Sequence, residues 1–399
     1  MDIFDQPCYK TTKNLASVIG RWPYQPQKQS SIIILVLWIA LALQTIPQII
    51  AMFIYYDDSD VLFEALSVIL VDIVLAAKYL NASYRAELIK TLFDKVQMDW
   101  KLLKNEEERR ILQYHADIGR FLSAGYIAFL FASSVIFVTE PLVPRIYSYL
   151  STSNGSVPLL FAFPAEFVLF EKEDHYWLML VVTSTLTLVV VVGVISCDVI
   201  FITLLQHICG LFAVLGHRIE HIPTGDFMKE NRKENCISLQ KNDRDISYQH
   251  LVSCVELHSR AIKFAELLET CFALSFGVVV GLNLPMISIT GFQVITRSNT
   301  VQQILKCISF TGAQILHLFF DCYLSQKLND SSSQICHCIA NVKWYNHSVK
   351  SQKLLVVMTM RSQVPCKLTA GKMMELSIEN YGMMLKTAGS YFTMLLSMQ

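Results

Sequence analysis

Few residues in this chain have the types and spacing that support covalent or metal chemistry. Cys336-His337-Cys338 brings three metal-ligating side chains together, but they lie too close for a zinc knuckle, and no second motif accompanies them. The sequence contains no glycine-rich phosphate loop and no serine in a nucleophile elbow. We therefore predict that the protein is not an enzyme and that it holds no metal or cofactor.

Charged residues near the C-terminus are better candidates for function. Glu375 and Glu379 are four residues apart, and they could concentrate cations in a vestibule or complement a helix dipole and nearby Lys372. Lys386 falls inside an apolar stretch, where a charge is costly. We expect Lys386 to form a structural ion pair, with Asp72 or Asp198 as its partner.

The composition indicates the class of protein in which these charged residues are placed. Hydrophobic residues make up 53% of the 399 residues and charged residues only 17%, against about 25% charged in average soluble proteins. The 33 Lys and Arg cancel the 33 Asp and Glu, so no basic excess is available for nucleic acid. Disorder is excluded, because 23 Phe and 16 Tyr accompany only 15 Gly. The composition indicates a multi-spanning membrane protein.

Seven stretches are long and apolar enough to be candidates for membrane-spanning helices, which need about 20 residues. They are residues 32–55, 61–80, 121–138, 176–205, 266–289, 301–324 and 373–398. Residues 1–31 are polar and show no cleavable signal peptide.

The basic residues of the connecting loops predict the orientation. One side of the membrane receives most of the 33 Lys and Arg, and the other side receives Arg145, Lys172 and Arg297. The N-terminus is therefore expected in the cytosol and the C-terminus outside. Asn154-Gly-Ser156 is then a glycosylation candidate in an outer loop, and no cysteine lies in an outer loop to form a disulfide framework.

The long cytosolic loops have helical periodicity. Leu88, Leu92 and Val96 recur among charged residues, and Leu251 and Val255 do the same before the fifth stretch. Two interpretations remain open: these segments are solvated extensions of the spans, or they pack together as an intracellular assembly domain. The inverted polarity argues against a G-protein-coupled receptor, and the lack of an internal repeat argues against a transporter.

The last sixty residues carry the most specific pattern. It comprises Trp344-Tyr345-Asn346, Met358-Thr359-Met360-Arg361, Pro365, Leu368-Thr369-Ala370-Gly371, Leu376-Ser377, Asn380-Tyr381 and the segment from Leu385 to Phe392. This pattern resembles the C-terminal signature of insect odorant receptors, and the chain's length, seven-span layout and polarity are similar to that family as well.

The resemblance implies an all-α, seven-transmembrane subunit of a ligand-gated, non-selective cation channel. Such channels are tetramers in the plasma membrane of olfactory neuron dendrites, where an odorant-tuned subunit joins an odorant co-receptor. The co-receptor has a longer cytosolic loop before the fifth span, so this chain resembles the tuning subunit. The expected partners are the co-receptor, a small volatile hydrophobic ligand, permeant cations and membrane lipid.

The resemblance also divides the chain. It implies a cytosolic N-terminal segment (1–31), six transmembrane helices with cytosolic extensions and an odorant-binding bundle (32–334), a cytosolic anchor helix (335–368) and a pore-lining helix (369–399). Met394 and Met398 match the family's outer gate, where a hydrophobic constriction closes the pore by dewetting. Alternatively, these methionines only pack against lipid or against the protein core. Tyr391, Glu375 and Glu379 would line the pore or its vestibule, and Trp344 and Tyr345 would anchor subunits.

The family places its odorant site in the outer half of the bundle, between spans two, three, four and six. The matching candidates in this chain are Leu70, Val71, Val74, Phe129, Ser133, Ile136, Phe137, Met179, Thr183, Phe310 and Gln314. Ordinary helix packing is the alternative role of each. Two other functions remain as alternatives: a gustatory-type receptor channel that assembles alone, and a membrane transporter.

Overall fold

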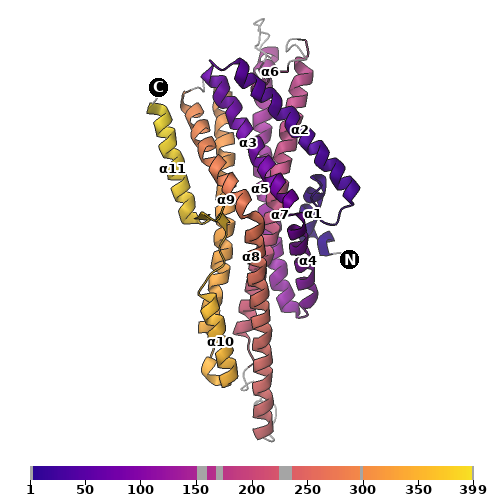
Figure 1. The fold of residues 1–399 in the computed structure, drawn as a ribbon, viewed down its shortest axis with the longest axis vertical. Coiled ribbons are helices and arrows are strands. Elements are labelled where there is room, and N and C mark those ends of the chain that lie inside the picture. Colours follow the sequence, from indigo (N-terminus) through magenta and orange to yellow (C-terminus); the bar gives the residue numbers. More distant parts are fainter. Residues whose placement is uncertain (1–2, 151–159, 168–173, 224–235, 297–299, 398–399) are drawn as a thin grey trace.

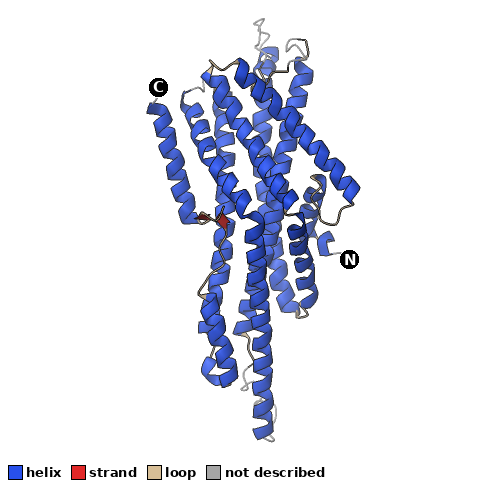
Figure 2. Ribbon diagram, viewed as in Figure 1, coloured by secondary structure: helices blue, strands red, loops and turns tan. Residues whose placement is uncertain are grey.

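A computed structural model describes residues 3–150, 160–167, 174–223, 236–296 and 300–397, and helices make up nearly all of it (Figure 2). Four short helices and turns flank the long ones: η1 (Ile3–Asp5), α1 (Pro7–Val18), η2 (Glu140–Leu142) and α6 (Val143–Leu150). The others are α2 (Gln27–Ile54), α3 (Ser59–Tyr84), α4 (Ala86–Leu102), α5 (Glu106–Thr139), α7 (Tyr176–Glu220), α8 (Cys236–Thr296), α9 (Val301–Ala340), η3 (Trp344–Asn346), α10 (Val349–Ser362) and α11 (Ile378–Ser397).

Five helical segments among the described residues are long and apolar enough to cross a membrane. They are Gln27–Ile54, Glu106–Ile146, Tyr176–Glu220, Ile246–Thr296 and Val301–Ala340. The predicted spans 61–80 and 373–398 fall in α3 and α11, which are not among these five. Most of the long helices run along the long axis of the molecule, while α2 crosses them obliquely, and the C-terminus lies at the end that also carries α6 (Figure 1).

The long helices continue well past the apolar stretches, and their extensions pack against one another. α7 shows this best, since Leu204, Leu205, Ile208, Leu211 and Leu215 are all at most 1% exposed. The lower part of α5 packs on it through a bidentate ion pair between Arg218 and Glu108, with both N···O distances 2.7 Å. The interpretation of these extensions as solvated helices is therefore wrong, because they share one buried core within the chain.

The N-terminal segment belongs to the same core. Phe4 packs edge-on against Trp22 and Phe93, with ring centroids 5.2 and 5.6 Å apart. The indole nitrogen of Trp100 on α4 donates to the hydroxyl of Tyr9 at 2.9 Å. These aromatic contacts hold the segment against α4, and the hydroxyls of Thr12 and Thr203, 2.7 Å apart, join α1 to α7. Residues 3–26 are therefore an integral part of the bundle.

The segment after α9 differs from the sequence prediction. The expected anchor helix, 335–368, breaks after Ala340, and the chain turns through η3 before α10 begins at Val349. A two-stranded antiparallel hairpin follows, formed by β1 (Thr369–Ala370) and β2 (Met374–Glu375). Gly371 and Lys372 form its turn with φ angles of 63° and 60°, in the left-handed region. The last helix therefore begins at Ile378, and Glu375 lies on a strand.

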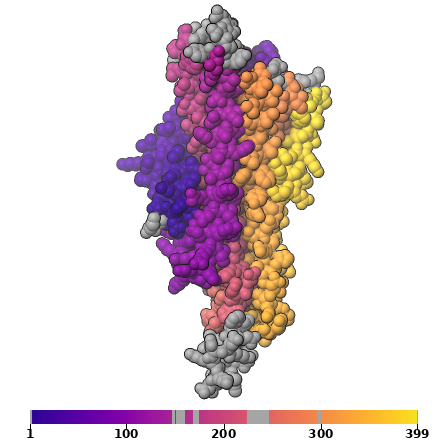
Figure 3. Space-filling model, turned by 180° about the vertical axis from the view of Figure 1, so that it is seen from behind, coloured from indigo at the N-terminus to yellow at the C-terminus, as the bar shows by residue number. Residues whose placement is uncertain are grey.

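α11 stands at the edge of the bundle, against α8 and α9 (Figures 1 and 3). Only Met384 and Ala388 of its residues are fully buried. Ser288 on α8 donates a hydrogen bond to the backbone oxygen of Ala388 at 2.9 Å, and Phe319 on α9 packs on Tyr381 with ring centroids 5.6 Å apart. The other faces of α11 are exposed in the single chain.

Candidate ligand pocket

A cavity of about 90 Å³ lies within the bundle formed by α2, α3, α5, α7 and α9. Its walls are mostly aliphatic and aromatic, with a few amide, hydroxyl and imidazole groups among them. The lining residues are Gln44, Val68, Val71, Val74, Leu130, Ser133, Ser134, Phe137, Thr187, Val190, Val191, Val194, Phe310, Ala313, Gln314 and His317. An apolar cavity with few polar groups suits a small hydrophobic molecule.

Six of the eleven residues proposed from the sequence line this cavity: Val71, Val74, Ser133, Phe137, Phe310 and Gln314. The other five do not. Phe129 is 43% exposed on the outer face of α5, and Leu70 and Ile136 are half-buried beside the cavity walls. Met179 and Thr183 are buried, but they lie one to two turns above the level at which α7 meets the cavity, which begins at Thr187.

Sequence reasoning missed the contribution of α2 and placed the α7 contribution too near the outer end. Gln44, Thr45 and Gln48 interrupt the apolar stretch 32–55, and this group of polar residues is the signal that could have identified the contribution of α2. Val190, Val191 and Val194 sit within a uniformly apolar run. Such a run has no helical periodicity, so the inward face of α7 could not be read from it.

A second, more polar pocket of about 190 Å³ lies next to the cavity and shares Phe137 and Phe310 with it. The rings of these two residues are 5.5 Å apart and form the partition between the two spaces. Lys306 lies on the polar side, where it donates to Glu64 at 2.6 Å, approaches Glu140 at 3.7 Å and stands 5.0 Å above the ring of Phe137. An apolar chamber thus adjoins a charged one.

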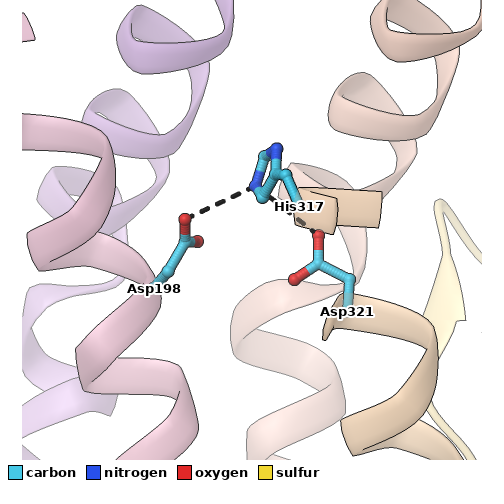
Figure 4. Close-up of side chains that lie close together, drawn as sticks. All are labelled: Asp198, His317 and Asp321. Atoms are coloured by element: carbon cyan, nitrogen blue, oxygen red, sulfur yellow. Dashed lines mark ion pairs between the residues drawn. The ribbon is translucent and has the colours of Figure 1, made fainter. Parts of the chain in front are cut away.

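A buried ionic network adjoins the cavity through His317. The imidazole Nε2 lies 3.4 Å from Asp198 and 3.8 Å from Asp321 (Figure 4), and Lys78 contacts both Asp198 and His317, the latter at 2.7 Å. Tyr126 also donates to Asp198 at 2.6 Å. The network ties α3, α5, α7 and α9 together at one level of the bundle.

Asp198, His317 and Asp321 have the donor types of a metal site, and their ligand atoms lie within 4.8 Å of one another. The Lys78 ammonium bonds both Asp198 and His317. It therefore already supplies a positive charge to this buried cluster. The arrangement is that of a buried ion pair satisfied by hydrogen bonds.

The predicted pairing of Lys386 with Asp72 or Asp198 is wrong. Asp198 pairs with Lys78, and Asp72 accepts hydrogen bonds from Gln44 at 2.9 Å and Thr45 at 3.0 Å. Lys386 is exposed on α11 in the single chain. The sequence could not show that Lys78, at the inner end of its apolar stretch, faces inward while Lys386 faces outward.

The other C-terminal candidates are placed as follows. Glu375 pairs with Lys367 at 2.8 Å and accepts from Asn329 at 3.1 Å, so its carboxylate is held by the hairpin region. Glu379 is exposed in the first turn of α11. Tyr391 and Met394 are 52% and 56% exposed, and the side chains of Trp344 and Tyr345 in η3 are exposed as well. Met398 and Asn154 lie outside the described residues.

The sequence profile described as "7tm Odorant receptor" matches residues 58–389. The chain belongs to this odorant receptor family. It is 22% identical to Odorant receptor 63a and 20% identical to Odorant receptor 9a, both of Drosophila melanogaster, over 63% and 73% of its own length. The matched parts cover 58% and 69% of those two relatives. Odorant receptor Or2 of Anopheles gambiae is 23% identical over 82% of each chain.

Solved structures show the same fold. The olfactory receptor OR5 of Machilis hrabei in complex with eugenol superposes with a TM-score of 0.78, and the match covers 98% of this chain and 97% of that one at 13% identity. The structure of OR5 described without eugenol gives a TM-score of 0.76 over the same shares. The chain is therefore an all-α, multi-pass membrane protein of the insect odorant receptor family, which is a receptor family and not an enzyme family.

Proposed function

We propose that this chain is the odorant-binding subunit of a ligand-gated, non-selective cation channel that assembles as a heterotetramer with an odorant co-receptor in the plasma membrane. The observation that carries the proposal is the apolar cavity between α2, α3, α5, α7 and α9. Its size and walls suit a small volatile compound, and OR5 of Machilis hrabei, which shares the fold, is described in complex with eugenol.

α9 provides a route from ligand to pore. It lines the cavity with Phe310, Ala313, Gln314 and His317, and less than one turn later Phe319 packs on Tyr381 of α11. A ligand that fits better when α9 is displaced would therefore also displace the contact surface of α11. Such a ligand shifts the equilibrium between closed and open states by its difference in affinity for the two.

The exposed faces of α11 and η3 suit contacts between subunits. Met394 and Tyr391 leave more than half of their surface uncovered in the single chain, and so do Trp344 and Tyr345. In the proposed tetramer the α11 helices surround the pore, with Met394 and Met398 as the outer constriction. Glu379 is then the vestibule carboxylate available to cations, because Glu375 is engaged by Lys367.

The test is whole-cell current in cells that express this chain with and without an insect odorant co-receptor, recorded against a panel of volatile compounds. We expect a fast, cation-selective, odorant-dependent current only when both subunits are present. Current from this chain alone would contradict the tuning-subunit assignment and favour a channel that assembles by itself. Surface-expressed chain that yields no odorant-dependent current with the co-receptor, across a broad panel, would contradict the channel function.

A further inference from the structure

One buried amide of the cavity wall has an oxygen atom without a hydrogen-bond partner. Gln44 lines the cavity from α2 and is 2% exposed. Its amide nitrogen donates to Asp72 at 2.9 Å, while its amide oxygen has no hydrogen-bond partner among the described residues. A buried carbonyl oxygen without a partner is unfavourable, and such groups in native proteins have a specific reason to persist.

Asp72 fixes which end of the amide is left unpaired. In the structure the NH₂ group of Gln44 faces Asp72 and donates to a carboxyl oxygen of that side chain. Thr45 and Gln48 also direct donors to this carboxylate, at 3.0 and 3.4 Å. The Gln44 oxygen is thereby presented as an acceptor in the cavity wall, and Asp72 acts as its positioning residue.

A second amide faces the same cavity from the opposite side of the bundle. Gln314 on α9 lines the cavity and is 9% exposed. Its amide can donate to an oxygen atom that already donates to Gln44. Two amides of this kind, set in otherwise apolar walls, match a ligand that has an apolar body and a single hydroxyl group.

We propose that the cavity selects volatile alcohols and phenols, whose hydroxyl donates to the oxygen of Gln44, over ethers of the same size. This inference rests on the proposed odorant-binding function and names its ligand class. A site built to bond a hydroxyl discriminates against an analogue that lacks the donor, because the acceptor is then left unpaired. The expected discrimination is about tenfold in Kd for one neutral hydrogen bond.

Two pairs of isomers distinguish the effect of the hydroxyl donor from the effect of molecular size. The pairs are benzyl alcohol with anisole, and cyclohexylmethanol with methoxycyclohexane. Their apparent Kd values for the purified full-length chain follow from the dependence of Tm on ligand concentration. The decisive quantity is the ratio of the ether's Kd to the alcohol's Kd, compared between wild type and variants. This ratio cancels differences in stability between the variants and differences in hydrophobicity between the compounds.

Gln44→Met removes the acceptor and keeps the side-chain length, and Gln48→Met is the matched control. Gln48 lies one turn away on α2, is fully buried and also donates to Asp72, but it does not line the cavity. We expect the ratio to fall about tenfold in Gln44→Met and to stay within about twofold of wild type in Gln48→Met. An unchanged ratio in Gln44→Met, an equal fall in Gln48→Met, or no binding of either alcohol to the wild-type chain overturns the inference.

The binding measurement needs no current and no co-receptor. Its failure is therefore distinguishable from failure of the channel function, which is decided by the recordings described above.

Discussion

Gly277 of α8 lies directly against the backbone of Gly371, at the turn of the hairpin that precedes α11. A Cβ atom at position 277 would stand 2.9 Å from both the Cα and the nitrogen of Gly371. The Gly371 nitrogen donates to the backbone oxygen of Ala273, one turn earlier on α8, at 2.7 Å. The start of α11 is thus fixed to α8 by backbone contacts that only small residues allow.

We expect Gly277→Ala to displace the hairpin and to destabilise the protein by about 1–3 kcal/mol, because backbone atoms cannot move aside as a flexible side chain would. The measurement is the Tm of the purified chain, together with the odorant dose–response of the assembled channel. Gly281→Ala is the control, since a Cβ there meets nothing within 4 Å and the site is one turn further along the same helix. Equal behaviour of the two variants would contradict the close approach of α8 and the hairpin.

The ion pair between Lys78 and Asp198 should be the most sensitive polar contact in the bundle. Both side chains are at most 8% exposed, so removing either partner leaves a buried charge. We expect Lys78→Met and Asp198→Asn each to cost about 3–5 kcal/mol of stability, measured by thermal unfolding in detergent. Lys13→Met removes an ion pair to Asp5 that is 30% and 50% exposed, and it should cost less than about 1 kcal/mol.

A double variant with apolar residues at both positions sharpens this test. Lys78→Met combined with Asp198→Leu should recover most of the loss of the single variants, because both charges of the pair are removed together. Additive losses in the double variant would show that the two side chains do not act as a pair.

Much of the fold follows from the sequence, because length and hydropathy suffice to identify long apolar helices. Six of the seven proposed spans lie almost wholly inside a helix, and the seventh begins five residues ahead of α11. The hairpin could not be predicted from the sequence, because its strands have two residues each and its turn depends on contact with Gly277 of α8. Local patterns cannot report a conformation that a distant segment imposes.

The pocket was predictable on those helices that present one polar face. Ser133 and Gln314 interrupt apolar stretches, and both line the cavity. In α7, hydrophobic residues occupy every face over several turns, so the depth at which this helix meets the cavity is set by its packing on α5. His317 and Lys78 were overlooked because each lies on a separate helix, and only the folded bundle brings them together.

The reactivity of Cys366 shows whether the segment between α10 and β1 packs against α9. Cys366 is 8% exposed and its backbone nitrogen bonds Ser332 at 2.9 Å. Burial raises the pKa of Cys366 from 9.0 to about 11. Only the thiolate reacts, so at a given pH below 9 this thiol is ionised about a hundredfold less than an unperturbed one.

We therefore expect maleimide at pH 8 to label Cys366 at least tenfold more slowly than Cys336, which is partly exposed on α9. Peptide mass spectrometry of the native chain measures both sites in one experiment. Denatured chain provides the control, where both cysteines should react at similar rates. Rapid native labelling of Cys366 would place the segment away from α9 and α8.

In the proposed channel, a volatile ligand opens the pore by occupying the cavity between α2, α3, α5, α7 and α9. The most direct measurement is odorant-evoked current, with the co-receptor present, from the wild type and from Ala313→Leu, whose larger side chain fills part of the cavity. Ala132→Leu is the matched control, because Ala132 is exposed on α5 outside the cavity. We expect Ala313→Leu to reduce odorant potency at least tenfold at normal surface expression, and Ala132→Leu to respond as wild type. Unchanged potency in Ala313→Leu would contradict the account.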